Sequence, residues 1–110
     1  MTEIILYRDK DTNITGGVLK GHTDYAEEGS DTVCASVSSV LFMTLNGIEN
    51  VLNISFGCEA ESGYAEFVFP DDLDDNDRKQ INILLESMYL YYKELEGQYS
   101  KNIKITELEV

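Results

Sequence analysis

The sequence of 110 residues has no tryptophan, one proline, one histidine and two cysteines, and few of its charged residues are basic. It holds 8 Lys and Arg against 21 Asp and Glu, which gives a formal net charge of −13. Nucleic acids and anionic membranes both attract basic surfaces, so this charge argues against either as a partner. A basic protein or peptide would instead be attracted to the chain.

Long apolar runs and a targeting signal are also missing. The short apolar stretch at residues 4–7 follows no basic segment, so it lacks the form of a signal peptide. No run approaches the ~20 apolar residues of a membrane span. These absences predict a cytoplasmic protein in which Cys34 and Cys58 stay reduced and unbridged. The length predicts one domain over residues 1–110.

Hydrophobic periodicity and turn residues predict an α+β fold of mostly antiparallel strands with two packed helices, in the order ββαββαβ. Apolar residues from Val33 to Ile48 recur at spacings of three and four, which is the stripe of a packed helix. The predicted elements are strands at residues 3–7 and 14–21, a helix from Asp31 to about Ile48, strands at 51–56 and 64–69, a helix from the acidic cluster 71–77 to Gly97, and a strand at 103–108.

Residues 21–38 contain the only histidine, His22, and place Cys34 in the first turn of a helix. With Asp31 as the N-cap, Cys34 takes the third helical position. The dipole and the free amides of a helix start favour negative charge, and the thiolate is the nucleophilic form of cysteine. The same amides could hold the oxyanion that forms when a carbonyl is attacked.

His22 lies at the end of a predicted strand, and the loop between it and Cys34 contains Gly29. Such a loop allows the imidazole to take the thiol proton and return it to a leaving amine. The residues alone leave non-catalytic roles open for both side chains, because a lone cysteine is most often a small buried side chain and a lone histidine is most often solvated. Ser38, one turn after Cys34, is expected to pack or hydrogen-bond on the same helix face. Cys58 is expected to be an inert thiol.

The segment resembles the signature of the ribosomal-processing cysteine protease family, abbreviated Prp. That pattern runs Gly-His, two residues, Tyr-Ala, two residues, Gly, one residue, Asp, one residue, Val-Cys-Ala, one residue, Val-Ser. The chain is also similar to the family in its length and element order, and it departs from the residues common there at Asp24, Thr32 and Ser36. The matching positions are Gly21, His22, Tyr25, Ala26, Gly29, Asp31, Val33, Cys34, Ala35, Val37 and Ser38.

The resemblance implies a cysteine endopeptidase that removes a short N-terminal extension from large-subunit ribosomal protein 27, a basic partner. It also implies a homodimer. By resemblance, His22 is the general base and Cys34 is the nucleophile. The supporting positions that the pattern implies are Gly21, Gly29, Asp31 and Ser38.

Two other functions stay open: a non-catalytic, ribosome-associated peptide-binding module that uses the same cleft, and a thiol redox protein. Metal and phosphate sites find no support. The acidic run at 72–83 lacks the glycine and the final glutamate of a calcium loop. His22, Cys34 and Cys58 are too few and too widely spaced for a zinc site, and no glycine-rich phosphate loop is present. We therefore expect neither a metal nor a cofactor.

Overall fold

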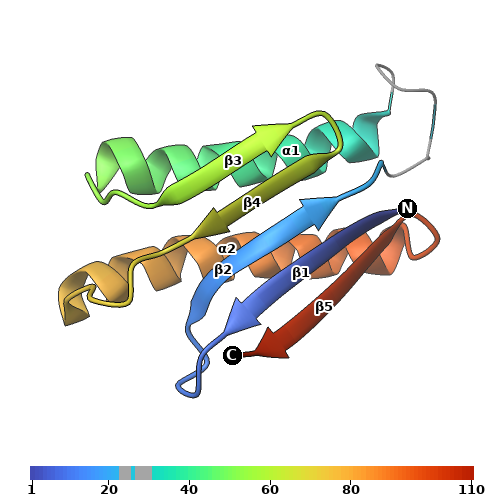
Figure 1. Cartoon of the computed structure of the whole chain (residues 1–110). Coiled ribbons are helices and arrows are strands. Elements are labelled where there is room, and N and C mark those ends of the chain that lie inside the picture. The colour runs from blue at the N-terminus through green and yellow to red at the C-terminus, as the bar shows by residue number, and fades with distance from the viewer. Residues whose placement is uncertain (23–25, 27–30) are drawn as a thin grey trace.

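A computed structural model of the chain describes residues 1–22, 26 and 31–110. Five strands form one sheet in the order β3-β4-β2-β1-β5, and two long helices lie on one face of it (Figure 1). The predicted α+β class and the order ββαββαβ are confirmed. The elements are β1 Thr2–Arg8, β2 Ile14–Lys20, α1 Thr32–Asn46, the π-helical turn η1 Gly47–Val51, β3 Gly57–Glu61, β4 Tyr64–Val68, α2 Asp75–Gln98 and β5 Ile103–Glu109.

Antiparallel pairs dominate the sheet, as predicted. β1 and β2 form one hairpin, β3 and β4 form another, and β4 joins the two by pairing with β2. The exception is β5, which returns after α2 to pair in parallel with β1. β1 therefore lies inside the sheet, and its inward residues Ile4 and Leu6 have no exposed surface.

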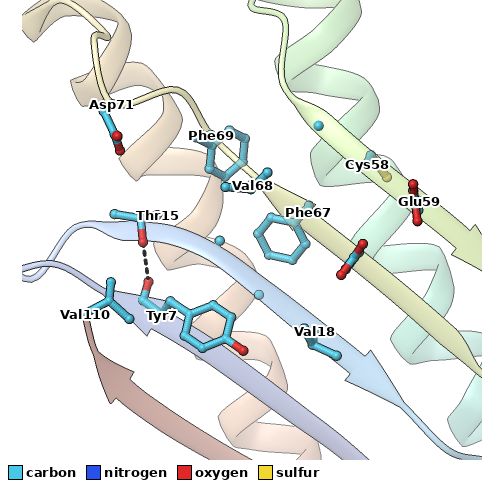
Figure 2. Close-up of a pocket in the computed structure, with 14 residues that line it drawn as sticks. Tyr7, Thr15, Val18, Cys58, Glu59, Phe67, Val68, Phe69, Asp71 and Val110 are labelled. Carbon is cyan, nitrogen blue, oxygen red and sulfur yellow. Dashed lines mark hydrogen bonds between the residues drawn. The ribbon is translucent and has the colours of Figure 1, made fainter.

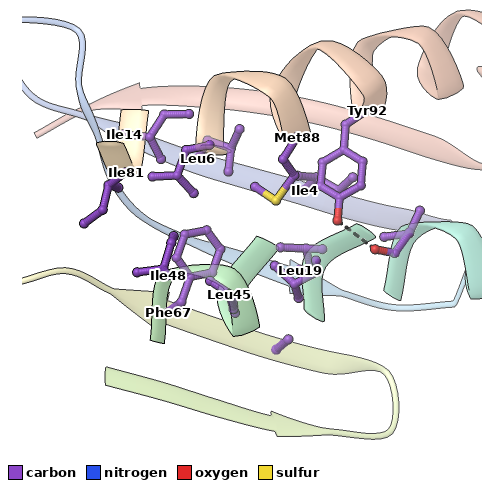
Figure 3. Close-up of a cluster of buried hydrophobic side chains, with 14 of the residues drawn as sticks. Ile4, Leu6, Ile14, Leu19, Leu45, Ile48, Phe67, Ile81, Met88 and Tyr92 are labelled. Carbon is purple, nitrogen blue, oxygen red and sulfur yellow. Dashed lines mark hydrogen bonds between the residues drawn. The ribbon is translucent and has the colours of Figure 1, made fainter. Parts of the chain in front are cut away.

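One hydrophobic core fills the space between the sheet and the helices (Figure 3). At its centre the buried Tyr92 of α2 donates its hydroxyl to the carbonyl oxygen of Val37 at 2.7 Å. Burial raises the pKa of Tyr92, so the phenol stays protonated and keeps this bond between the helices. Core residues labelled in Figure 3 include Ile4, Leu6, Ile14, Leu19, Phe67, Leu45, Ile48, Ile81, Met88 and Tyr92.

The strand predicted at residues 51–56 is wrong. α1 passes Asn46 without ending and runs through η1 to Val51, and β3 begins only at Gly57. Asn53 adopts a positive φ of 57°, which interrupts an extended backbone. Ile54 reaches the core from this irregular segment, and its amide bonds to the carbonyl of Ile48. Its apolar pattern thus reflects packing without strand pairing.

Both helix starts lie where the sequence predicts them. Asp31 caps α1, and Asp74, within the predicted acidic cluster, caps α2 by accepting the amide of Asp77 at 2.7 Å. α2 continues to Gln98, one residue beyond the predicted end at Gly97. Each cap satisfies an amide that would otherwise lack a partner at the helix start.

The helical segment Thr32–Val51 has 20 residues and a mean hydropathy of 1.2, so by length and composition alone it could cross a membrane. Serine and threonine residues interrupt it, which is why no continuous apolar run marks it in the sequence. Its buried residues pack toward the sheet, as the apolar side of a core helix does.

Arg8, at the end of β1, connects the sheet to α2. Its guanidinium donates two bonds to Glu86 at 2.8 and 2.9 Å and one to Glu107 at 2.7 Å. It also lies over the ring of Tyr89, 4.9 Å from the centroid. The hydrogen bond from Arg8 is the main reason that the pKa of Glu107 falls below its usual value of 4.5.

We expect Arg8→Met to lower the free energy of unfolding by about 1–2 kcal/mol at pH 7, because two carboxylates lose a bonded partner. Since the folded-state pKa of Glu107 is lowered, this stabilisation is present above the usual glutamate pKa and is lost as the pH falls through the folded value. Urea unfolding of both proteins from pH 7 to pH 3 measures the difference.

The matched control is Lys93→Met, which removes the exposed ion pair between Lys93 and Glu96. We expect that change to cost at most about 0.5 kcal/mol. If the difference in free energy of unfolding between wild type and Arg8→Met stays constant down to pH 3, the assigned role of the Arg8 network is contradicted.

Candidate active site

Gly21 sets the position of His22 at the end of β2. Its φ is +89°, and a Cβ built there would collide with the carbonyl oxygen of Met1, so only glycine fits. The Gly21 amide donates to the carbonyl of Gly63 at 2.8 Å. This bond ties the end of β2 to the turn of the β3–β4 hairpin, and the chain continues directly into His22.

The imidazole of His22 lies against the backbone of Gly63. A Cβ built on Gly63 would lie 2.9 Å from Nε2 of His22, closer than real Cβ contacts allow. Gly63 also has a φ of +75°, which favours glycine. The hairpin turn therefore forms one side of the position that the ring occupies.

Cys34 takes the third helical position of α1, as the sequence predicts. The buried carboxylate of Asp31 accepts the amide of Cys34 at 2.9 Å. The cap engages the N–H of Cys34, so this amide is not one of the free helix-start amides that could hold an oxyanion. The thiol is free of any disulfide and is half-buried.

His22 and Cys34 line the same cavity, of about 250 Å³, and Ser38 lines it one helical turn beyond Cys34. We call it the His22–Cys34 cavity. α1 supplies one wall, and the turn of the β3–β4 hairpin supplies the opposite wall. The other residues that line it are Thr2, Leu19, Gly21, Val37, Leu41, Phe42, Glu61, Ser62, Gly63, Tyr64 and Ala65.

Two of the predicted site positions, Tyr25 and Gly29, lie outside the described residues. The structure brings together five others: Gly21, His22, Cys34 and Ser38 line the cavity, and Asp31 caps the helix beside it.

Two parts of the cavity lining, the hairpin turn and Phe42, were not predicted as parts of the site. Phe42 lies eight residues after Cys34, and this helical spacing was the available signal for it. Nothing local to Gly63 indicated that it would meet His22, which lies 41 positions earlier in the sequence.

Cys58 is exposed and lies on β3. Partial burial, and then the nearby carboxylates of Glu49, Glu59 and Glu66, raise the pKa of the Cys58 thiol. A raised pKa leaves less thiolate at neutral pH, which disfavours Cys58 as a nucleophile.

The chain matches known proteins along most of its length. A family model described as "Cysteine protease Prp" matches residues 1–104. The ribosomal processing cysteine protease Prp of Bacillus subtilis is 32% identical over 112 residues, which cover 96% of each chain. That of Staphylococcus aureus is 28% identical over 92 residues, covering 84% of this chain and 85% of the relative.

Solved structures share the fold. The crystal structure of an essential ribosomal processing protease Prp from S. aureus with a covalently linked product peptide superposes with a TM-score of 0.87 at 24% identity. It covers 97% of this chain and 99% of that one. A Streptococcus mutans protein gives a TM-score of 0.81 at 21% identity, covering 100% and 96%.

Proposed function

The chain belongs to the cysteine protease Prp family, and from this premise we propose that it removes the N-terminal extension of large-subunit ribosomal protein 27, with Cys34 as nucleophile and His22 as general base. The observation that carries the proposal is the His22–Cys34 cavity, where the end of β2 and the first turn of α1 present an imidazole and a thiol to one space. Its location would be the cytoplasm, where ribosomal proteins are made.

The bonds that form and break involve these two groups, the substrate and water. His22 takes the thiol proton of Cys34, and the sulfur attacks the scissile carbonyl carbon. The imidazolium then protonates the leaving amine, the C–N bond breaks and a thioester remains on Cys34. Water, deprotonated by His22, attacks the thioester and releases the carboxylic acid, which restores the thiol.

The surroundings hold both groups in place. Gly21 and Gly63 fix the position of His22, and the cap by Asp31 fixes the first turn of α1. With the Cys34 amide engaged by that cap, an oxyanion needs a donor elsewhere on the cavity. Ser38 lines it on the same helix face, and we propose its hydroxyl as a hydrogen-bond donor to the substrate.

The test is mass spectrometry of a peptide that spans the extension and the junction of the host's ribosomal protein 27. We expect a single cut at the junction. If folded and reduced protein leaves the peptide uncut, or cuts it at other bonds as fast as at the junction, the result would count against this substrate. Peptide binding without turnover would instead support the binding-module alternative, and thiol oxidation without cleavage would support the redox alternative.

We also propose a homodimer formed through the outer face of the helices. α1, η1 and α2 form an apolar groove of about 750 Å³ there, and its exposed members Met43, Val51 and Ile83 are 71%, 76% and 68% exposed. An apolar face of this kind is typical of subunit contacts. Sedimentation equilibrium should give a dimer for wild type and a monomer for Ile83→Lys. The control Leu108→Lys, on the face of the sheet opposite to the helices, should remain a dimer. A monomeric wild type would overturn this proposal.

A further inference from the structure

The face of the sheet opposite to the helices is covered by no described element (Figure 1). Side chains alternate along each strand, so the burial of Ala65 and Phe67 under the helices places Tyr64, Glu66 and Val68 of β4 on the opposite face. We call this the open face. Such a face in an antiparallel sheet is ordinarily polar throughout.

Here the open face contains a hollow that is lined in part by apolar and aromatic residues. The hollow has a volume of about 750 Å³, and Tyr7, Val18 and Val68 are among the residues around it (Figure 2). Gly16 and Gly57 lie in the same cross-strand row and contribute no side chains to fill it. We call it the sheet hollow. Its apolar and aromatic surface is of the kind that contacts an extended chain or a long side chain.

Negative charge borders the sheet hollow. Glu59 on β3 and Glu66 on β4 lie directly opposite one another, and the next residue in their row, on β2, is the uncharged Val18. Among the described residues that line the hollow, the charged ones are all acidic: Glu59, Glu66 and Asp71. Like charges placed directly across a strand pair destabilise a sheet. A cation at this position would relieve that repulsion.

The sheet hollow and the His22–Cys34 cavity lie on opposite faces of the sheet, and both include residues of β3 and β4 in their lining. Glu61 and Tyr64, which line that cavity, form the strand pair next to Glu59 and Glu66 on the same face. The two pairs are two residues apart along each strand, or roughly 7 Å. A chain that leaves the cavity over the hairpin therefore meets the acidic pair first and the hollow next.

We propose that the open face docks a segment of the substrate, rich in lysine or arginine, that follows the cleaved bond. This inference rests on the proposed function, in which the substrate is a basic protein with its body on the C-terminal side of the cut. Glu59 and Glu66 would hold cationic groups, and Tyr7 would offer an aromatic ring to an alkyl stem or a guanidinium. A second copy of this acidic chain would be repelled there.

The test uses two peptides with the same extension and junction. One continues into a twelve-residue tail of Gly-Ser-Lys repeats and the other into a tail of Gly-Ser-Gln repeats. For wild type we expect the lysine tail to lower KM about fivefold relative to the glutamine tail, as two partly exposed ion pairs allow. In Glu59→Gln/Glu66→Gln that advantage should vanish, while cleavage of the glutamine-tailed peptide stays at the wild-type rate.

The matched control is Glu94→Gln/Glu109→Gln, which removes two exposed carboxylates that do not line the sheet hollow. It should keep the fivefold advantage. If the KM advantage of the lysine tail survives in Glu59→Gln/Glu66→Gln, contacts in the cavity explain it and docking is overturned. If the advantage falls equally in both double variants, long-range attraction explains it and docking is likewise overturned. If neither peptide is cut, the proposed function fails. Docking is then tested by fluorescence anisotropy of both labelled tails with the Cys34→Ala variant, in which the lysine tail should bind more tightly than the glutamine tail only while Glu59 and Glu66 are present.

Discussion

Cys34→Ala is expected to abolish cleavage of the junction peptide, lowering kcat/KM by about 10⁴-fold or more, because the other thiol, Cys58, does not line the cavity. His22→Ala should lower it by a similar factor, since an unassisted thiol keeps its proton and the leaving amine goes unprotonated. Residues that act as one unit are not additive, so the double variant should be no worse than either single variant.

The matched control is Cys58→Ala, which removes the exposed thiol on β3 and should leave kcat/KM within about twofold of wild type. Unfolding midpoints of all the variants show whether lost activity reflects lost structure. Cleavage by Cys34→Ala at a wild-type rate would exclude Cys34 as the nucleophile. Tight peptide binding by a wild type that never cuts would indicate a binding module.

Gly63→Ala has the second largest expected effect, a loss of about 100-fold in kcat, because the new Cβ would occupy space within 2.9 Å of His22 Nε2. The ring must shift, and a displacement of about 1 Å in a catalytic group costs on that order. KM should change much less, since Cys34 and the α1 wall of the cavity are untouched. Steady-state kinetics on the junction peptide measures both parameters.

Gly63 also has a positive φ, so alanine strains the turn whatever its neighbours are. Gly63→Asn separates the two effects only partly, because asparagine tolerates that backbone but still carries a Cβ. Both variants should therefore lose kcat, while Asn should retain more stability than Ala. Gly97→Ala, where a Cβ meets nothing within 4 Å, is the control and should keep full activity. Wild-type kcat in a folded Gly63→Ala variant would show that Gly63 does not position His22.

Local relationships in the site were predictable from the sequence. The cap of Cys34 by Asp31 spans three residues and follows from residue preference at a helix start. Ser38 follows Cys34 by one turn, so helical geometry alone places both on one face. The β1–β2 hairpin and both helices were likewise predictable, because their apolar patterns have clear periods.

Relationships across the sheet were not predictable in this way. The contact between His22 and Gly63 depends on the pairing of β4 with β2, which sets which turn reaches the end of β2. The apolar alternation at residues 51–56 favoured a strand, yet the positive φ of Asn53 and the burial of Ile54 show an irregular segment that packs on the core. Burial without strand pairing gives the same sequence pattern as a strand.

The central claim is that Cys34, activated by His22, is the thiol that attacks a peptide carbonyl. The most direct test is labelling with a chloromethyl ketone built on the residues that precede the scissile bond, followed by digestion and mass spectrometry. The account predicts one adduct per chain, on half-buried Cys34 and not on exposed Cys58, formed far more slowly in His22→Ala. Two results would contradict it: faster labelling of exposed Cys58 than of Cys34, or labelling of Cys34 at the same rate in wild type and in His22→Ala.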